Sequence, residues 1–186
     1  CRNAEVCLNG TVIGNPRGGS MAVFDREWRD GDGSLLRLPM EVTTSRWYEN
    51  SVAVERGPLV YALAMRETWE KKPFGDGETA QFGDEYYEVT SADKWNYGIL
   101  ARAAEQPENI FRILDKEKQQ GRFFWNPENA PVRIRVRARE IPTWTLYNEM
   151  AGPLPYSVAQ ALPEEEIELI PYGCTTLRIS EFPLVR

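Results

Sequence analysis

The chain has 186 residues with 22 basic and 28 acidic side chains, which gives a formal net charge of −6 and an isoelectric point near 4.9. This acidic balance disfavours nucleic acid as a partner, and the absence of histidine excludes imidazole-based triads and histidine-ligated metals. Three cysteines without a CxxC pair predict neither a zinc site nor a disulfide framework. The longest apolar run, Leu59–Met65, is far shorter than the roughly 20 residues that cross a bilayer, so we expect no membrane partner.

The N-terminal residues carry period-two patterning interrupted by turn signals. Ala4–Leu8 followed by Asn9-Gly10 predicts a strand that enters a type I′ turn, and Ser20–Phe24 is the expected return strand. Residues 36–41 alternate apolar and polar side chains, as in a half-buried strand. Pro39 within this stretch indicates a bulge or an edge position.

The next segment contains the strongest apolar run of the chain. Val52 and Val54 predict one strand, and Gly57-Pro58 introduces Leu59–Leu63, which is typical of a central strand buried on both faces. After Trp69 the composition changes to charged residues, Pro and Gly. We therefore expect a boundary between two domains, 1–69 and 70–186.

The second half of the chain is also dominated by strand patterns. In Val132–Arg139, apolar residues face one way and Arg133, Arg135, Arg137 and Arg139 the other. Residues 105–120 have mixed periodicity and fit either a short helix or an exposed hairpin. The other expected strands are Tyr86–Val89, Tyr97–Ala101, Ile167–Ile170 and Thr175–Ile179. Short strands at intervals of roughly 8–12 residues predict an all-β fold of two small antiparallel β-sandwich domains.

Paired carboxylates are the first candidates for chemistry, because glycoside hydrolysis needs two of them roughly 5–10 Å apart. Glu85 with Glu88, or the run Glu164–Glu166, has the required residue type. With 28 acidic residues, such pairs also arise on solvated turns, and this alternative is favoured. We therefore assign no catalytic residue.

Aromatic side chains are the second candidates, because exposed Trp and Tyr rings stack on sugars. Trp95, Tyr97 and Trp144 are the expected carbohydrate-binding residues, whereas the other tryptophans are assigned to the core. The four arginines of 133–139 suit either an anionic ligand or cross-strand pairing with Glu, and the pairing is commoner. Cys174 is expected to be an inert buried thiol.

Several segments, taken in order, resemble glycoside hydrolase family 127, the β-L-arabinofuranosidase-like proteins. The central one is Ser51–Leu63, which reads SVAVERGPLVYAL. The others are Leu38–Val42, Lys94–Gly98, Ala151–Pro155 and Ile170–Arg178.

The resemblance implies the C-terminal β-sandwich region, of jelly-roll type, that follows an (α/α)₆ catalytic barrel in this family. It implies that domain 1–69 is incomplete, lacking at least one strand before Cys1. We therefore expect that the exposed edge either pairs with the edge of another copy or leaves the first domain frayed. The family's zinc-bound cysteine and Glu acid/base belong to the barrel, so this chain is expected to hold no cofactor, metal or activity. Cys174 matches a C-terminal motif instead.

The main functional hypothesis is a non-catalytic accessory region that braces the catalytic barrel of a glycoside hydrolase. The alternative is a carbohydrate-binding module, with a glycan as partner. A lipoprotein acylated at Cys1 is a third, weaker hypothesis. The resemblance implies a periplasmic or extracellular location for the parent protein.

Overall fold

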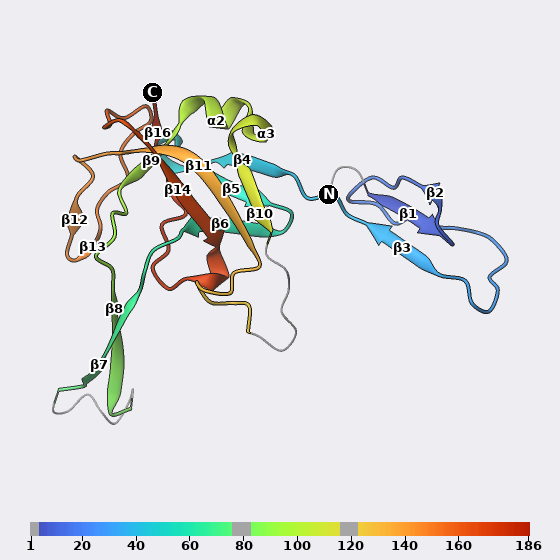
Figure 1. Ribbon diagram of the computed structural model, residues 1–186, viewed down its shortest axis with the longest axis horizontal. Coiled ribbons are helices and arrows are strands. Elements are labelled where there is room, and N and C mark those ends of the chain that lie inside the picture. Colours follow the sequence, from blue (N-terminus) through green and yellow to red (C-terminus); the bar gives the residue numbers. More distant parts are fainter. Residues whose placement is uncertain (1–3, 76–82, 116–122) are drawn as a thin grey trace. The chain divides into compact units, whose positions relative to one another are not determined.

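The computed structural model describes residues 4–75, 83–115 and 123–186, and nearly all of its regular structure is β (Figure 1). The all-β prediction is confirmed. Two compact units are present, an N-terminal unit, Cys1–Glu41, and a C-terminal unit, Val42–Arg186. The division expected between residues 69 and 70 falls within strand β7 (Thr68–Pro73), which belongs to the second unit.

The N-terminal unit is a three-stranded antiparallel sheet. Its order is β2-β1-β3, formed by β1 (Glu5–Leu8), β2 (Thr11–Gly14) and β3 (Ser34–Arg37). Asn9 and Gly10 adopt positive φ angles of 48° and 83°, as a type I′ turn requires. Because this turn takes only two residues, Thr11 pairs at once with Leu8. The return strand is therefore β2, and the prediction of a strand at Ser20–Phe24 was wrong.

The apolar residues of this unit are poorly covered. Ala4, Cys7 and Leu8 are buried, but every residue of β3 is exposed, with Leu36 at 56%. The prediction of a half-buried strand over 36–41 was wrong, since the strand ends at Arg37 and Leu38 and Met40 are exposed as well. A single three-stranded sheet has too few layers to bury both of its faces.

The C-terminal unit is built on a nine-stranded sheet. Its main path runs β15-β5-β6-β14-β11-β9-β16, while β4 pairs with β5 and β10 with β11. All of these pairs are antiparallel except β9 with β16. The strands are β4 (Val42–Arg46), β5 (Val52–Arg56), β6 (Leu59–Leu63), β9 (Tyr97–Leu100), β10 (Arg112–Asp115), β11 (Val132–Glu140), β14 (Glu164–Pro171), β15 (Glu181–Phe182) and β16 (Leu184–Val185).

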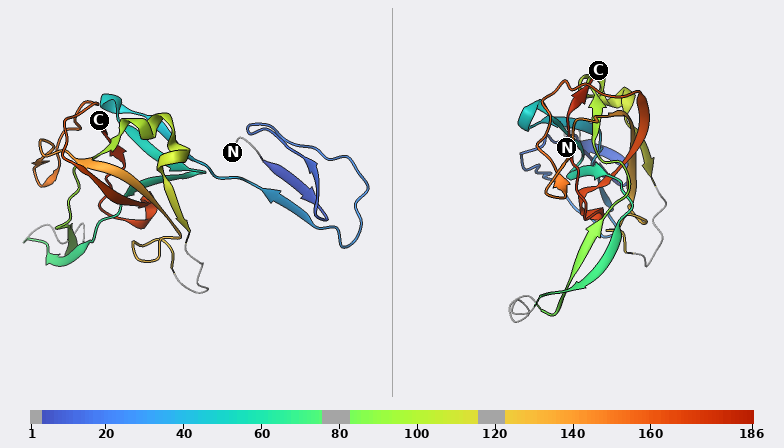
Figure 2. Two further views of the ribbon diagram at one scale, coloured as in Figure 1. Left: turned by 45° about the horizontal axis from the view of Figure 1, so that its top comes forward. Right: turned by 90° about the vertical axis from the view of Figure 1, so that its left-hand side faces the viewer.

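The last residues of the chain connect the two ends of this sheet. β15 and β16 are separated only by Pro183, yet β15 pairs with β5 and β16 with β9. The sheet therefore curls around a shared interior (Figure 2). Phe182 and Val185 are fully buried in this closing segment. The largest other fully buried side chains are Tyr61, Ile99, Ile134, Ile141, Leu169, Ile170, Val52 and Val54.

The alternation predicted for residues 132–139 is confirmed by β11, in which Ile134, Val136 and Ala138 are buried. Strand β6 follows the prediction less closely, since Tyr61–Leu63 is buried but Val60 is 38% exposed. The strand predicted at Thr175–Ile179 is absent, because the chain there turns after the 3₁₀ turn η2 (Tyr172–Cys174).

Smaller elements complete the unit. Helices α2 (Ala101–Glu105) and α3 (Pro107–Ile110) precede strand β10. The undecided stretch 105–120 therefore holds a short helix followed by a strand that pairs with β11, and its end lies outside the described residues. None of the helices in the described part of the chain is long and apolar enough to span a membrane. The remaining elements are η1 (Tyr48–Asn50) and the hairpins β7–β8 (Thr68–Pro73 with Glu85–Thr90) and β12–β13 (Leu146–Tyr147 with Met150–Ala151).

Candidate ligand-binding groove

The three side chains predicted to bind carbohydrate are largely enclosed. Trp144 is 4% and Tyr97 6% exposed, and Trp95 is half-buried with its ring 5.0 Å from that of Trp144 in an edge-to-face contact. The Trp144 indole N–H donates to the Gly152 carbonyl at 2.9 Å. Burial, followed by the charge and hydrogen bond of Glu165, raises the pKa of Tyr97 to about 12. The expected exposure was therefore wrong, and a carbohydrate-binding role for these residues stays a prediction.

The carboxylates of the candidate acidic pairs form ion pairs with Lys and Arg side chains. Glu85 forms an ion pair with Lys71 and Glu88 with Lys72, and their register places the two carboxylates on opposite faces of the β7–β8 hairpin. The run Glu164–Glu166 lies in β14 beside arginines and Lys94. Neither set presents two facing acids to a common substrate.

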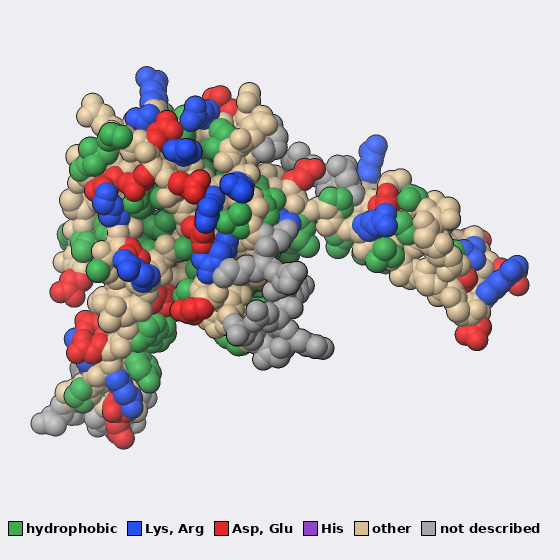
Figure 3. Space-filling model, viewed as in Figure 1, with side chains coloured by type: hydrophobic (Ala, Val, Ile, Leu, Met, Phe, Trp, Pro, Cys, Tyr) green, Lys and Arg blue, Asp and Glu red, His purple; other side chains and the backbone are tan. Residues whose placement is uncertain are grey.

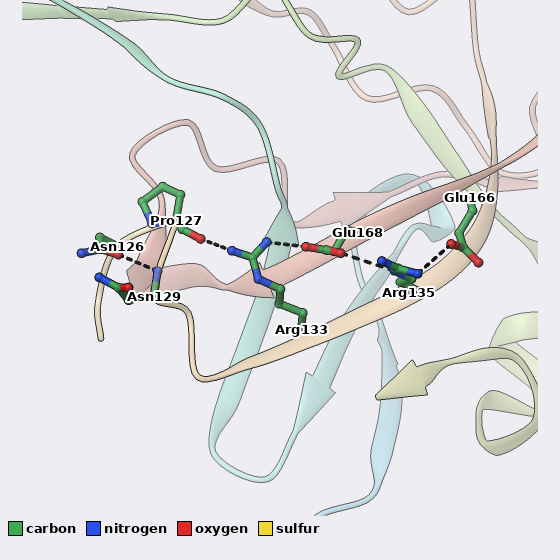
Figure 4. A network of polar contacts seen from close by, with 7 residues as sticks. All are labelled: Asn126, Pro127, Asn129, Arg133, Arg135, Glu166 and Glu168. Atoms are coloured by element: carbon green, nitrogen blue, oxygen red, sulfur yellow. Dashed lines mark hydrogen bonds and ion pairs between the residues drawn. The ribbon is translucent and has the colours of Figure 1, made fainter. Parts of the chain in front are cut away.

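Three of the four arginines of β11 lie opposite glutamates of β14, whereas Arg133 lies opposite Leu114 of β10. In register, Arg135 opposes Glu168, Arg137 opposes Glu166 and Arg139 opposes Glu164. Figure 4 shows that Arg133 and Arg135 both bind the Glu168 carboxylate and that Arg135 also reaches Glu166 at 3.5 Å. Cross-strand pairing with Glu, the commoner alternative, is the arrangement found for Arg133, Arg135 and Arg139.

Arg133 has a second role in this network. Its guanidinium also donates to the carbonyl of Pro127, in the loop of residues 123–131 (Figure 4). Within the same loop, the backbone N–H of Asn129 donates to Oδ1 of Asn126 at 2.8 Å. The sheet therefore fixes a loop that has no regular structure of its own, and this loop carries Trp125.

Cys174 is buried beneath the same loop. Its exposed fraction is 1%, and its thiol lies 3.4 Å from the Phe124 carbonyl. Burial raises the pKa of the Cys174 thiol, although the nearby Arg133 charge opposes the shift. Among the described residues, no group of three or more Cys, Asp or Glu side chains is placed to hold a metal ion.

A groove of about 380 Å³ lies where the β7–β8 hairpin leaves the rest of the C-terminal unit. Figure 3 shows hydrophobic side chains gathered near this junction. Trp69 of β7 and Trp125 of the 123–131 loop line the groove and are 53% and 49% exposed. Polar contributions come from Asn126, Thr175, Thr176 and the charged Glu67, Glu128 and Arg178.

Glu67 ties the base of the hairpin to the segment after η2. One carboxylate oxygen accepts from the Thr175 hydroxyl at 2.7 Å and from the backbone N–H groups of Thr176 and Leu177. Two backbone amides of the predicted strand 175–179 are thus bound to a side chain instead of a neighbouring strand. Burial acts to raise the pKa of Glu67, but the hydrogen bonds from these residues and Trp69 outweigh it and lower the pKa below 4.5.

The Trp69 ring is oriented by a hydrogen bond and by an aromatic contact. Its indole N–H donates to the other oxygen of Glu67 at 3.2 Å, and its ring contacts Tyr87 edge-on at 5.7 Å. Trp69 and Tyr87 share one face of the hairpin because Lys71, two residues after Trp69, pairs with Tyr87. The ring orientation is therefore set by contacts within this unit.

Trp125 depends on a neighbouring glycine. A Cβ atom at Gly173 would lie 3.2 Å from the Trp125 ring, closer than such contacts normally allow. Trp125 also lines an adjoining groove of about 430 Å³, together with Tyr172 and the apolar stretch 58–60. The Arg178 guanidinium lies 4.6 Å from the Tyr172 ring centroid, within cation–π distance. Trp125 thus stands between two grooves, each with another exposed aromatic ring in its wall.

Trp69 and Trp125 were predicted from the sequence to lie in the core, and this prediction was wrong. Trp28 and Trp47, assigned likewise, are also more than half exposed. For Trp69 a usable signal was present, because Glu67, Glu70, Lys71 and Lys72 surround it in a segment too charged for a core strand.

Comparison with solved structures places this fold within a larger protein. The whole chain matches a protein described as a glycoside hydrolase, with a TM-score of 0.56 and 23% identity over 26% of that chain. It also matches a GH127 β-L-arabinofuranosidase from Geobacillus stearothermophilus T6 at 18% identity and a TM-score of 0.47, over 25% of that chain. No family model and no curated sequence matches. The chain spans about a quarter of the length of each of these two proteins, and the first match shows that it shares its fold with part of that glycoside hydrolase.

Proposed function

We propose that this chain is a non-catalytic accessory region of a glycoside hydrolase and packs against a catalytic domain. The observation that carries the proposal is the match of the entire chain to 26% of a glycoside hydrolase. The order of the motifs around Ser51–Leu63 and Ile170–Arg178, which resembles β-L-arabinofuranosidase-like proteins, supports the same conclusion.

The state of the candidate acids supports a non-catalytic role. Lys and Arg side chains form ion pairs with all of them, namely Glu85, Glu88 and Glu164–Glu166. Glu67 has its carboxylate surrounded by donors that favour the ionised form, which is unsuited to donating a proton near neutral pH. A catalytic domain would supply the reacting groups.

The N-terminal unit supplies a surface suited to packing against another domain. Its exposed large hydrophobic residues are Val12, Met21, Val23, Trp28, Leu35, Leu36, Leu38 and Met40. Large exposed apolar patches commonly mark interaction surfaces, and contacts between domains of one chain bury about 600–1,500 Å². Coverage by a catalytic domain would remove this apolar area from water.

Two forms of the parent protein test the proposal, the whole gene product and a version from which this chain is deleted. We expect the deletion to lower the melting temperature of the catalytic domain, and we expect the isolated chain to hydrolyse no aryl arabinofuranoside. Hydrolysis by the isolated chain that a carboxylate substitution abolishes would overturn the proposal. An unchanged melting temperature after the deletion would contradict the bracing role.

A further inference from the structure

We propose that the groove between Trp69 and Trp125, with its extension toward Tyr172, is a binding site for a neutral oligosaccharide. This inference goes beyond the accessory role, because it assigns a ligand to a surface of the C-terminal unit alone. It also differs from the carbohydrate-binding residues expected from the sequence, since Trp95, Tyr97 and Trp144 do not line this groove.

Aromatic exposure is the first support. Trp69, Trp125 and Tyr172 are 53%, 49% and 41% exposed, although Trp side chains are mostly buried on average. The carbon-bound hydrogens of a sugar ring form apolar patches that pack on such rings, while the sugar hydroxyls need polar partners at the edges. This groove provides both kinds of surface.

Preorganisation is the second support. Trp69 is held by Glu67 and Tyr87, and the Trp125 ring packs against Gly173 in a loop that Arg133 anchors to the sheet. Side chains that are already ordered lose little conformational entropy when a ligand binds. Rings that served only to pack the core would be buried, whereas these rings are held in place and remain exposed.

Charge selects the class of sugar. The groove is lined by the acidic Glu67 and Glu128 and by one basic residue, Arg178. The balance is −1, and the whole chain carries −6, so an anionic polymer such as a uronate would be repelled. A neutral oligosaccharide can accept hydrogen bonds from Arg178 and Thr176 and donate to the carboxylates.

Dimensions and continuity extend the site along a chain of sugars. The groove at Trp69 has a volume of about 380 Å³ and the one at Tyr172 about 430 Å³, and Trp125 lines both. Small-molecule sites typically occupy about 300–1,000 Å³. Three aromatic rings along adjoining grooves suit a linear oligosaccharide better than a single monosaccharide.

Calorimetric titration of the chain with neutral arabinan, xylan and galactan oligosaccharides tests the proposal, with polygalacturonate as the anionic comparison. At least one neutral oligosaccharide should bind, and Trp125→Ala or Trp69→Ala should lower the affinity about tenfold. Trp28→Ala is the matched control, since Trp28 is 54% exposed in the N-terminal unit, and it should leave the affinity unchanged.

A positioning variant separates ring placement from ring removal. Gly173→Ala retains all three aromatic rings but displaces Trp125, so it should weaken binding while the melting temperature stays within a few degrees of the unchanged chain. Trp125→Phe should restore part of the affinity that Trp125→Ala loses.

Three results would overturn the proposal: no binding by any neutral oligosaccharide, an equal loss in Trp28→Ala, or tighter binding of polygalacturonate. Acrylamide quenching in the whole gene product supplies a fourth. The fluorescence of Trp125 is obtained as the difference between the unchanged protein and Trp125→Phe. If acrylamide fails to quench it before sugar is added, the groove is covered by another domain and is an interface. The accessory role would survive each of these results, because it is tested by deletion of the chain.

Discussion

The two units of this chain use the same kind of antiparallel pairing but differ in how they bury apolar surface. In the C-terminal unit, one segment of five residues, 181–185, pairs with both ends of the main sheet and buries its own side chains. In the N-terminal unit, three strands leave β3 exposed along its whole length. Strand pairing alone therefore does not make a core, because a sheet also needs a second layer or closure onto itself.

The largest expected effect lies at the closing segment. Phe182→Ala removes a fully buried ring and should lower the free energy of unfolding by about 3–5 kcal/mol. Phe123→Ala is the control, because that ring is 66% exposed, and it should change stability by less than about 0.5 kcal/mol. Urea denaturation followed by circular dichroism measures both, and similar losses would refute the importance of closure.

A matched pair of leucines compares the two units directly. Leu169 is fully buried in β14, so Leu169→Ala should cost about 2–5 kcal/mol. Leu36 in β3 is 56% exposed, and Leu36→Ala should cost less than about 0.5 kcal/mol. Urea denaturation followed by circular dichroism measures both changes in the free energy of unfolding. A large loss for Leu36→Ala would mean that the N-terminal unit has a tighter core than its exposure indicates.

Strand positions were largely readable from the sequence in the C-terminal unit and much less so in the N-terminal one. The alternation of β11 was clear because a long half-buried strand repeats its pattern several times. The strand predicted at 20–24 failed because the Asn9-Gly10 turn fixes its own return strand, whatever apolar residues follow later.

The aromatic residues were the main failure of the sequence analysis. Trp144 was expected at the surface and is buried, whereas Trp69 and Trp125 were assigned to the core and are half exposed. A tryptophan suits either place, and the choice depends on contacts distant in sequence, such as Gly173 beside Trp125. The charged residues around Trp69 gave a local signal of its exposure, but no local pattern contains information about a contact such as that of Gly173 with Trp125.

Glu67 should have an intermediate and pH-dependent effect. Glu67→Gln removes the charge from hydrogen bonds to two backbone amides and a hydroxyl, and should cost about 1–2 kcal/mol at neutral pH. Because the folded-state pKa is lowered, the stabilisation is present above pH 4.5 and is lost as pH falls through the folded value. When the pH is lowered from neutral to below 4.5, the free energy of unfolding should fall less in Glu67→Gln than in the unchanged chain, as measured by denaturation at each pH. Parallel pH profiles would contradict this explanation.

The smallest expected effect is at the arginine–glutamate pairs. Arg135 is 41% exposed and its partners Glu166 and Glu168 are 50% and 27% exposed, so Arg135→Ala should cost about 0.5–1 kcal/mol. High salt screens such pairs and should reduce the difference from the unchanged chain. A salt-independent loss of stability above about 2 kcal/mol would show that Arg135 acts through packing of its aliphatic side-chain stem and not through its ion pairs.

Amide hydrogen exchange, in the isolated chain and in the whole gene product, tests the central claim most directly. The claim is that the C-terminal unit is stable by itself while the N-terminal unit packs on a catalytic domain. We predict slow exchange in β5, β6, β11 and β14 in both samples, and exchange over residues 4–41 that is fast in the isolated chain and slow in the whole protein. Equally slow exchange of residues 4–41 in the isolated chain, or no slowing in the whole protein, would contradict it.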